Sequence, residues 1–365
     1  MRILFICGSL EPGVDGVGDY TRRLAKSLIL RNYDVLLVSL RDRDAMDYIS
    51  EEQGNNIAIE TIRIPKSRTQ RERFNELQII LKEFNPDIIS LQFVPYSFSE
   101  KGLPFGFVRN VKSLGYKNKW HIMFHELWLG TVKDVSFKHK LIGYVQKLLI
   151  IQLLKKIQPD CISVQSILYR QKLENLGFKP ILFPLYGNIP VTKKKQNVKF
   201  EEGLFHFAIF GTIQQKNDFK IFIEWLKARE FNNSKFHFLG NNGALQKNWI
   251  AILEKENLEY ENYGWLKADD ISNILKNCNL GLSTTPYMLS DKSGSVAAMR
   301  EHRLKVLCIS TDRAVYDSFN KGLLPNDIII WNEGLKELPN AKVDLETVSV
   351  DNITNLFLNC LTTRL

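Results

Sequence analysis

The sequence has 365 residues, which is more than one ordinary hydrophobic core holds, and it predicts about two domains. Its 44% hydrophobic and 24% charged residues are typical of a soluble globular protein, and no stretch approaches the roughly 20 apolar residues of a membrane-spanning helix. The formal net charge of +9 favours an anionic partner. Because the chain begins directly with a strand-like run and no apolar signal segment, we expect a cytoplasmic protein.

Strand-like runs alternate with helix-like stretches, a pattern typical of parallel sheets covered by helices on both faces. In the first half we expect strands at 2–7, 34–40, 57–64, 87–94, 119–126, 160–166 and 179–185. In the second half we expect them at 204–211, 235–240, 258–264, 280–285, 305–310 and 327–331. A polar, turn-rich stretch separates the two series. The predicted organisation is a first domain over 1–188, a linker over 189–203, a second domain over 204–350 and a final helix over 351–365.

The first expected strand is followed by the glycine-rich stretch "GSLEPGVDGVGDYTRRLAKSL". Its glycines are spaced too widely for a dinucleotide-binding fingerprint, which argues against a nicotinamide site. Gly13, Gly16 and Gly18 come just before an amphipathic helix, so the loop would bring unhindered N–H groups to a helix N-terminus. Such an end suits a phosphate or a sugar hydroxyl. A mobile surface loop is the alternative.

Two segments of the first half have more than one interpretation. The acidic "DRD" at 42–44 looks like a metal-binding pair, but its flanking arginines favour a solvated turn. The apolar, lysine-bearing stretch at 138–157 is expected to be a helix buried against the first sheet. The alternative is a helix that lies at a membrane interface with its lysines among anionic headgroups, with the basic stretch 68–73 as a second contact.

The second half contains an independent candidate anion site. Lys292, Ser293, Gly294 and Ser295 lie between an expected strand and a helix that begins near Val296. Backbone donors, hydroxyls and a lysine at one helix end fit a diphosphate. The segment "FGTIQQKND" at 210–218 ends another strand in the same style, and its Lys216 could reach the same phosphates. An ordinary capped helix with solvated lysines is the alternative.

Six segments, in this order over nearly the whole chain, resemble the GT-B glycosyltransferases of family 4. They are "GVGDYTRRLA", "HELW", "ISVQS", "FGTIQQKND", "FLGNNG" and "GWLKADDISNILKNCNLGLSTTPY". The resemblance implies an α/β protein of GT-B architecture, with two facing Rossmann-like domains, parallel sheets and an interdomain cleft. It also implies a nucleoside-diphosphate sugar bound mainly by the C-terminal domain, an acceptor bound mainly by the N-terminal domain, and no metal or other cofactor.

The resemblance also implies site residues. His125 in "MFHELW" matches the family's histidine that faces the reacting sugar, where it would orient the sugar and stabilise developing positive charge; Glu126 is a weaker candidate. Apart from the resemblance, a lone histidine among apolar residues is more often a core residue. The implied donor-binding residues are Gly16, Gly18, Gly211, Thr212, Lys216, Gly240, Trp265, Tyr287, Lys292, Ser293, Gly294 and Ser295.

The sequence departs from the family pattern in the second half. Family members usually carry two glutamates separated by seven residues, whereas here Asp291 is near the first position, alanine or methionine is near the second, and Glu301 is out of register. Thr212 replaces the usual arginine after the strand glycine. These differences affect the donor-sugar contacts, so we derive no retaining or inverting outcome from the resemblance.

The expected function is transfer of a hexose or related sugar from a nucleoside-diphosphate sugar to a glycan or lipid-linked acceptor of a polysaccharide or glycolipid pathway. A non-catalytic sugar-nucleotide-binding protein or partner subunit and a GT-B sugar-nucleotide epimerase are the alternatives. No nucleic-acid partner is expected, because the aromatic residues are not interleaved with basic ones. If the 138–157 helix lies on a membrane, the protein would be peripheral at the inner face of that membrane.

Overall fold

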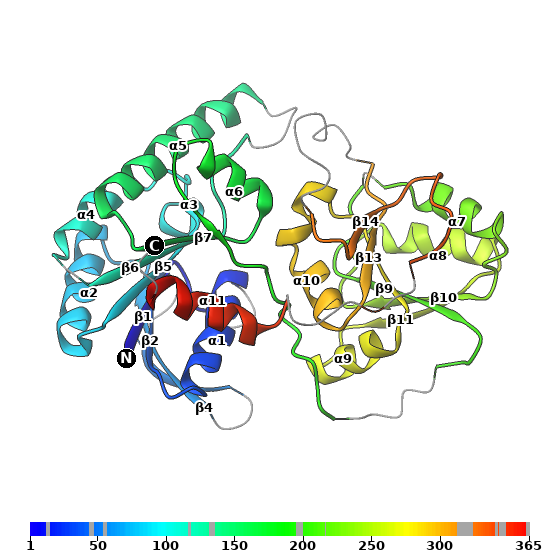
Figure 1. The fold of residues 1–365 in the computed structure, drawn as a ribbon, viewed down its shortest axis with the longest axis horizontal. Helices are drawn as coiled ribbons and strands as arrows, with labels where there is room; N and C mark the ends of the chain where they lie inside the picture. The colour runs from blue at the N-terminus through cyan, green and yellow to red at the C-terminus, as the bar shows by residue number, and fades with distance from the viewer. Residues whose placement is uncertain are drawn as a thin grey trace. The chain divides into compact units, whose positions relative to one another are not determined.

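The structure, a computed structural model, describes residues 1–11, 15–43, 47–53, 57–115, 118–130, 136–194, 200–215, 217–311, 324–339, 342 and 348–362. The chain forms two compact α/β units (Figure 1). The first unit comprises Met1–Gln165, Tyr169–Phe183 and Val350–Leu365, and the second comprises Ser166–Leu168 and Pro184–Ser349. The C-terminal segment therefore belongs to the same unit as the N-terminus.

An eight-stranded sheet forms the centre of the first unit, in the order β3-β4-β2-β1-β5-β6-β7-β8. All neighbouring strands are parallel except β3, which pairs antiparallel with β4 at one edge. The strands are β1 (Arg2–Cys7), β2 (Asp34–Asp42), β3 (Asp47–Gln53), β4 (Ile57–Pro65), β5 (Ile88–Phe93), β6 (Lys119–Phe124), β7 (Cys161–Val164) and β8 (Ile181–Leu182). Strand order reverses between β1 and β5, which is where sheets of this kind open a ligand-binding crevice.

Helices cover both faces of this sheet. They are α1 (Gly16–Ile29), α2 (Gln70–Phe84), α3 (Pro95–Phe98), α4 (Phe107–Ser113), α5 (Phe137–Ile157), α6 (Ile167–Glu174) and α11 (Val350–Thr362). α1 and α11 lie side by side on one face (Figure 1). There Thr354 Oγ1 donates to Ser27 Oγ over 2.9 Å, and the Phe357 ring stacks on Phe5 at 5.6 Å. Because α11 contributes a core aromatic, it is an integral part of the first unit.

The second unit is built on a six-stranded parallel sheet in the order β11-β10-β9-β12-β13-β14. Its strands are β9 (Phe205–Phe210), β10 (Ser234–Leu239), β11 (Glu259–Gly264), β12 (Leu280–Ser283), β13 (Lys305–Cys308) and β14 (Ile328–Ile330). Its helices are α7 (Phe219–Lys227), α8 (Gln246–Lys255), α9 (Ala268–Asn277), the 3-10 helix η1 (Tyr287–Lys292) and α10 (Gly294–Glu301). The strand order again reverses at the first strand, between β9 and β12.

Aromatic side chains dominate the core of the second unit. Phe207 and Phe236 stack across neighbouring strands at 4.8 Å, and Phe219 of α7 stacks on Trp249 of α8 at 3.7 Å. Trp331, after β14, is buried against Phe222. Large aromatic surfaces buried together contribute strongly to stability. The second unit therefore has a core of its own.

The structure confirms the expected α/β class and the position of each expected strand. The sequence did not predict β3, which adds an antiparallel strand at an otherwise parallel edge. All five cysteines are buried, in agreement with a packing role. The interpretation of 42–44 as a solvated turn is wrong for Asp42, which is fully buried at the end of β2. Asp44 lies outside the described residues.

Candidate functional site

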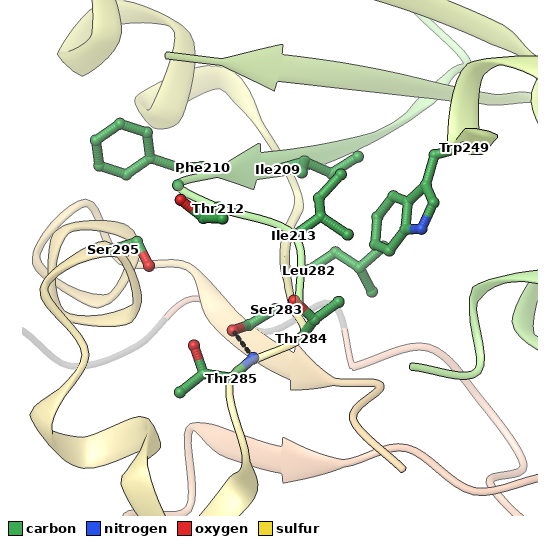
Figure 2. Close-up of a pocket in the computed structure, with 11 residues that line it drawn as sticks. Ile209, Phe210, Thr212, Ile213, Trp249, Leu282, Ser283, Thr284, Thr285 and Ser295 are labelled. Carbon is green, nitrogen blue, oxygen red and sulfur yellow. Dashed lines mark hydrogen bonds between the residues drawn. The ribbon is translucent and has the colours of Figure 1, made fainter. Parts of the chain in front are cut away.

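A pocket opens at the carboxyl ends of the central strands of the second unit, where the strand order reverses (Figure 2). Its free volume is only about 10 Å³, which is room for about one water-sized group. Open parallel sheets bind ligands at this position. The pocket is lined by Ile209, Phe210, Gly211, Thr212, Ile213, Trp249, Leu282, Ser283, Thr284, Thr285 and Ser295.

Gly211 brings the turn after β9 against the start of α10. Its φ is +88°, and a Cβ atom there would lie 2.9 Å from Ser295 Cβ. Both the conformation and the space exclude other residues. Asn242, which is fully buried, holds the same turn because its Nδ2 donates to Gly211 O over 2.8 Å. The close approach of this turn to α10 is therefore fixed from both sides.

The N-terminus of α10 forms one wall of the pocket and carries several hydroxyls. Ser293 caps the helix, since its Oγ accepts from Val296 N over 3.5 Å. Its Oγ also lies 3.1 Å from Ser295 Oγ and 3.4 Å from Thr285 Oγ1. The first amides of a helix have no intrahelical acceptor and bear partial positive charge. Hydroxyls and amides together can bind a phosphate oxygen here.

Gly294, the first residue of α10, borders open space. A Cβ atom built on Gly294 meets nothing within 4 Å, and its backbone does not adopt a positive φ. The protein itself therefore tolerates a side chain at this position. Lys292, at the end of η1 and two residues before Gly294, is half-buried. Lys216 lies outside the described residues.

The acidic residues near this site have structural contacts. Asp291 accepts from Ile167 N over 2.8 Å, and burial raises the pKa of its carboxyl to about 6. Glu301 Oε2 accepts from Gly187 N over 3.0 Å, where Gly187 packs so closely on Ala298 that a Cβ would lie 2.4 Å from Ala298 Cα. Glu301 therefore fastens the 184–194 segment to α10.

Of the expected donor residues that the structure describes in the second unit, three line the pocket, namely Gly211, Thr212 and Ser295. Six do not: Gly240, Trp265, Tyr287, Lys292, Ser293 and Gly294. Gly240 has a φ of +73°, and its N–H donates to Gly264 O over 2.8 Å at the ends of β10 and β11. Trp265 follows directly and is 85% exposed, so its indole is presented to solvent. Tyr287 is buried at the start of η1. Gly240 and Trp265 thus form a separate surface at the outer edge of the sheet.

In the first unit, His125 is the first residue after β6 and is 5% exposed. Its Nε2 lies 2.8 Å from Gln92 Oε1, and the Tyr20 ring meets its ring edge-on at 5.0 Å. Its backbone N–H donates to Phe93 O over 3.1 Å. Sheet, helix α1 and a side-chain amide therefore all orient this imidazole. Glu126, the next residue, is exposed.

Gln92 is one link of a polar chain buried between the sheet and α11. Its Nε2 donates to Ser90 Oγ over 2.8 Å, and Ser90 Oγ lies 2.8 Å from His121 Nδ1. His121 Nε2 lies 2.7 Å from Ser163 Oγ, which donates to Met123 Sδ over 2.8 Å. Burial lowers the pKa of His121 to about 3, so this ring is neutral at physiological pH.

The direction of this chain assigns the proton of His125. Because Ser163 donates to Met123, it accepts from His121 Nε2–H, and a neutral His121 must then accept at Nδ1 from Ser90. Ser90 in turn accepts from the Gln92 amide, which directs the Gln92 carbonyl to His125. His125 therefore donates from Nε2 to Gln92 Oε1.

Gly16 and Gly18 open helix α1, as the sequence predicted for a helix N-terminus. The cap is Asp15, whose carboxylate accepts from Val17 N over 2.8 Å and from Gly18 N over 3.3 Å. A carboxylate at this position already uses these donors and opposes a second anion. Gly13 lies outside the described residues.

The described part of the loop after β1 is held firmly. Asp42 accepts from Ser9 Oγ over 2.5 Å, from Leu10 N over 3.1 Å and from Arg63 Nε over 3.0 Å. Although burial raises the pKa of Asp42, the hydrogen bonds from Arg63, Ser39 and Ser9 outweigh it and lower the pKa. Asp42 thus holds Ser9 and Leu10, the loop residues that precede the glycines of the segment.

Several site residues were not predicted from sequence. Ser283, Thr284 and Thr285 line the pocket, and Thr284 Oγ1 accepts from Gln214 N over 2.8 Å. Three consecutive hydroxyl residues at the end of an expected strand could have indicated a binding site, because the ends of parallel strands meet at one edge of the sheet, where ligands bind. Asn242 and Gln92 gave no such signal, since their roles depend on contacts distant in sequence.

No protein-family model matches the sequence, and no curated protein matches it. Solved structures do match. Sucrose-phosphate synthase from Thermosynechococcus elongatus is 15% identical, with 84% of this chain and 81% of that chain covered and a TM-score of 0.52. A glycosyltransferase from Rickettsia africae is 13% identical, covering 99% and 88%, with a TM-score of 0.52. The UDP-GlcNAc 2-epimerase from Methanocaldococcus jannaschii is 12% identical, covering 98% and 99%, with a TM-score of 0.52.

These similarities extend over both units of the chain. At such low identity they show the fold, and with the two parallel-sheet units they establish the GT-B architecture that the resemblance implied. Both transferases and an epimerase share this architecture.

Proposed function

We propose that the protein is a family 4-like glycosyltransferase that moves a sugar from a nucleoside-diphosphate sugar to an acceptor hydroxyl. The observation that carries this proposal is the pocket at the strand-order reversal of the second unit, where Gly211, the hydroxyls of Thr285 and Ser295, and the capped end of α10 converge. Amide and hydroxyl donors at a helix N-terminus suit a diphosphate in charge and in hydrogen bonding. Such donors become stronger ligands as charge develops on a leaving group.

In the proposed reaction the acceptor hydroxyl oxygen forms a bond to the anomeric carbon of the donor sugar. The bond between that carbon and the diphosphate oxygen breaks, its electron pair goes to the diphosphate, and the hydroxyl proton is released. The N-terminus of α10 and the serine hydroxyls would stabilise the additional negative charge. Lys292, which directly precedes Ser293, and Lys216, which follows the Gly211 turn in the sequence, would add positive charge.

The first unit would contribute His125 to the reacting sugar. Its imidazole is oriented by the hydrogen bond between Nε2 and Gln92 Oε1 and by the Tyr20 ring that meets it edge-on. It can hold a sugar hydroxyl and stabilise positive charge at the anomeric carbon. Because α1 is capped by Asp15, we assign Gly16 and Gly18 to the transferred sugar rather than to the phosphates.

Calorimetry with UDP, GDP and ADP and with their glucose conjugates tests the donor site. We expect one nucleotide to bind, and Gly294→Val to weaken its binding at least about tenfold, or 1.4 kcal/mol. Because a Cβ atom at Gly294 would meet no atom of the protein within 4 Å, we attribute a loss of affinity to contact with the ligand. An unchanged affinity would remove the phosphates from α10.

Gly16→Val is the matched variant, since Gly16 is also the first residue of a helix and also borders open space. We expect it to leave the affinity for the nucleoside diphosphate unchanged and to lower turnover of the sugar nucleotide. His125→Ala should likewise lower turnover while the nucleotide affinity is retained. A loss of nucleotide binding in His125→Ala would contradict the assigned role.

A sugar-nucleotide epimerase is the second candidate, because the similarity to the UDP-GlcNAc 2-epimerase covers as much of the chain as the similarity to the transferases. Proton NMR of the sugar nucleotide incubated with and without an acceptor separates the two functions. A new epimeric sugar nucleotide identifies the epimerase, whereas release of nucleoside diphosphate that depends on acceptor identifies the transferase. Binding with neither product identifies a non-catalytic sugar-nucleotide-binding protein.

A further inference from the structure

Helix α5 presents a stripe of large apolar side chains to solvent. Phe137, Leu141, Tyr144 and Leu148 recur every three or four residues, so they share one side of the helix. They are 82%, 57%, 60% and 48% exposed. These four residues are the α5 stripe. Such a continuous run differs from the scattered single apolar residues of an ordinary surface, and it marks an interaction site.

Lysines flank the α5 stripe on both sides. At about 100° per residue, Lys138 and Lys156 lie at one side of the stripe, and Lys140 and Lys147 lie at the other. Lys155 continues the stripe at its C-terminal end. The 21 residues of α5 include these five lysines and neither Asp nor Glu. The surface is therefore apolar at its centre and cationic at its edges.

The opposite side of α5 packs into the first unit. Gly143, Gln146, Ile150, Leu153 and Leu154 are buried. The helix packs on the first unit with one face, as expected, while its other face is exposed. Among the described residues no helix is long and apolar enough to cross a bilayer. A helix with one anchored face and one apolar, lysine-edged face is instead suited to lie in a membrane interface.

We propose that α5 docks the protein on the surface of an anionic lipid bilayer. The α5 stripe would enter the boundary between headgroups and acyl chains, and the lysines would extend along the surface to the negatively charged headgroups. Charge complementarity selects this partner, because the flanking cations without a neighbouring acid on the helix match an anionic layer. This inference is independent of the donor pocket, which lies on the second unit.

The buried side of α5 connects this surface to His125. Gln146 Oε1 accepts from Leu129 N over 2.8 Å, and Gln146 Nε2 donates to Gly102 O over 3.0 Å. Gly143 lies so close to the same segment that a Cβ would be 2.1 Å from Leu129 O. The chain that follows His125 therefore rests on the helix that carries the α5 stripe. Docking would bring this part of the first unit to the membrane surface.

Co-sedimentation with vesicles tests the proposal on the full chain. We expect the protein to bind phosphatidylcholine vesicles that contain phosphatidylglycerol, to bind pure phosphatidylcholine vesicles much less, and to be released by salt. The double variant L141Q/L148Q should lose about tenfold or more in affinity, and K138Q/K140Q should lose most of the preference for phosphatidylglycerol. All four positions are exposed, and circular dichroism checks that the variants fold.

The matched control is I79Q/I221Q, which removes two exposed apolar side chains from other helices, and its binding should equal that of the unsubstituted protein. Equal binding to both vesicle types, or equal binding by L141Q/L148Q and the unsubstituted protein, would overturn the proposal. Light scattering after size exclusion tests the alternative that a second copy of the chain covers the α5 stripe. A dimer that L141Q/L148Q converts to a monomer would show that a second copy covers the stripe and would also overturn the proposal.

Discussion

At the scale of single residues, the orientation of His125 depends on the buried side chain of Gln92 in the neighbouring strand β5. Gln92 is 1% exposed and joins His125 to the chain that ends at Met123. Buried polar groups are costly when one partner is removed. The chemistry of an imidazole at the strand end therefore depends on a fully buried amide.

Gln92→Leu should destabilise the protein and release the tautomer of His125. The change removes the acceptor of His125 Nε2 and the donor to Ser90 Oγ, so we expect a loss of about 1–3 kcal/mol in the free energy of unfolding. Urea unfolding measures this loss. Nitrogen-15 NMR of the imidazoles should show His125 protonated at Nε2 in the unsubstituted protein and mixed tautomers in the variant. An unchanged His125 signal would contradict the positioning role.

Asp291 gives a pH dependence whose sign is set by burial. Its pKa is raised from the ordinary 3.8 to about 6, so between these values the folded protein binds a proton that the unfolded chain has lost. The free energy of unfolding from this group therefore falls as the pH rises through that interval, and it stays lower above pH 6. Ionised Asp291 is a destabilising group at neutral pH.

Asp291→Asn should remove this dependence, because an amide oxygen can still accept from Ile167 N without carrying charge. We expect the variant to be more stable by on the order of 2 kcal/mol at pH 7 and indistinguishable near pH 4. Urea unfolding of both proteins at several pH values gives the difference, in which the other titrating groups cancel. A variant that is less stable at pH 7 would show that Asp291 is stabilised by a charged partner.

At the scale of elements, α5 contains a glycine where helix propensity alone would favour alanine. Gly143 is tolerated because the segment after His125 crosses the helix at this point. In an exposed helix interior, replacing glycine by alanine stabilises by roughly 0.5–1 kcal/mol. Here the added methyl group would occupy the position of the Leu129 carbonyl. The close packing of Leu129 thus requires glycine at position 143 of α5.

Gly143→Ala should therefore destabilise the protein, by about 1–3 kcal/mol, because Leu129 and its neighbours must move. Gly294→Ala is the control, since its methyl group meets no atom and its effect should stay within about 0.5 kcal/mol. Chemical unfolding compares the two variants. If Gly143→Ala stabilises the protein, the close approach of Leu129 to α5 is contradicted.

Most strands were predictable because the central parallel strands, such as β1, β5 and β12, are buried on both faces and so read as short apolar runs between turn signals. β3 was missed because "DYISEEQ" is polar and pairs only at one edge. In the site, Ser293 and Gly294 were predictable as a helix cap. Gly211 was also expected at the donor site, but its contact with Ser295 was not, because it joins residues far apart in the sequence.

At the scale of the whole molecule, the C-terminal helix completes the unit that begins the chain. Phe357 of α11 contacts Phe5 at 5.6 Å and meets the His121 ring edge-on at 5.0 Å. The sequence predicted the helix but gave no indication of where it packs, since amphipathic periodicity identifies a buried face and not its partner. The stability of the first unit therefore depends on residues that follow the second unit.

Phe357→Ala should destabilise the first unit by about 3–5 kcal/mol, because it removes a fully buried aromatic ring. The second unit has a separate aromatic core and should keep its stability. Hydrogen exchange followed by mass spectrometry separates the two: peptides of β1 and β6 should lose protection, and peptides of β9 and β10 should not. Equal loss in both units would show that they unfold as one.

The assignment of α11 to the first unit also determines the order of events on the ribosome. Synthesis proceeds from the N-terminus, and domains fold as their residues emerge. The second unit, Pro184–Ser349, is fully translated before residues 350–362 exist, whereas the first sheet must wait for that helix with the hydrophobic surface around Phe5 and His121 uncovered. The first unit, whose strands are translated earliest, can therefore complete its packing only after the last part of the chain has been made.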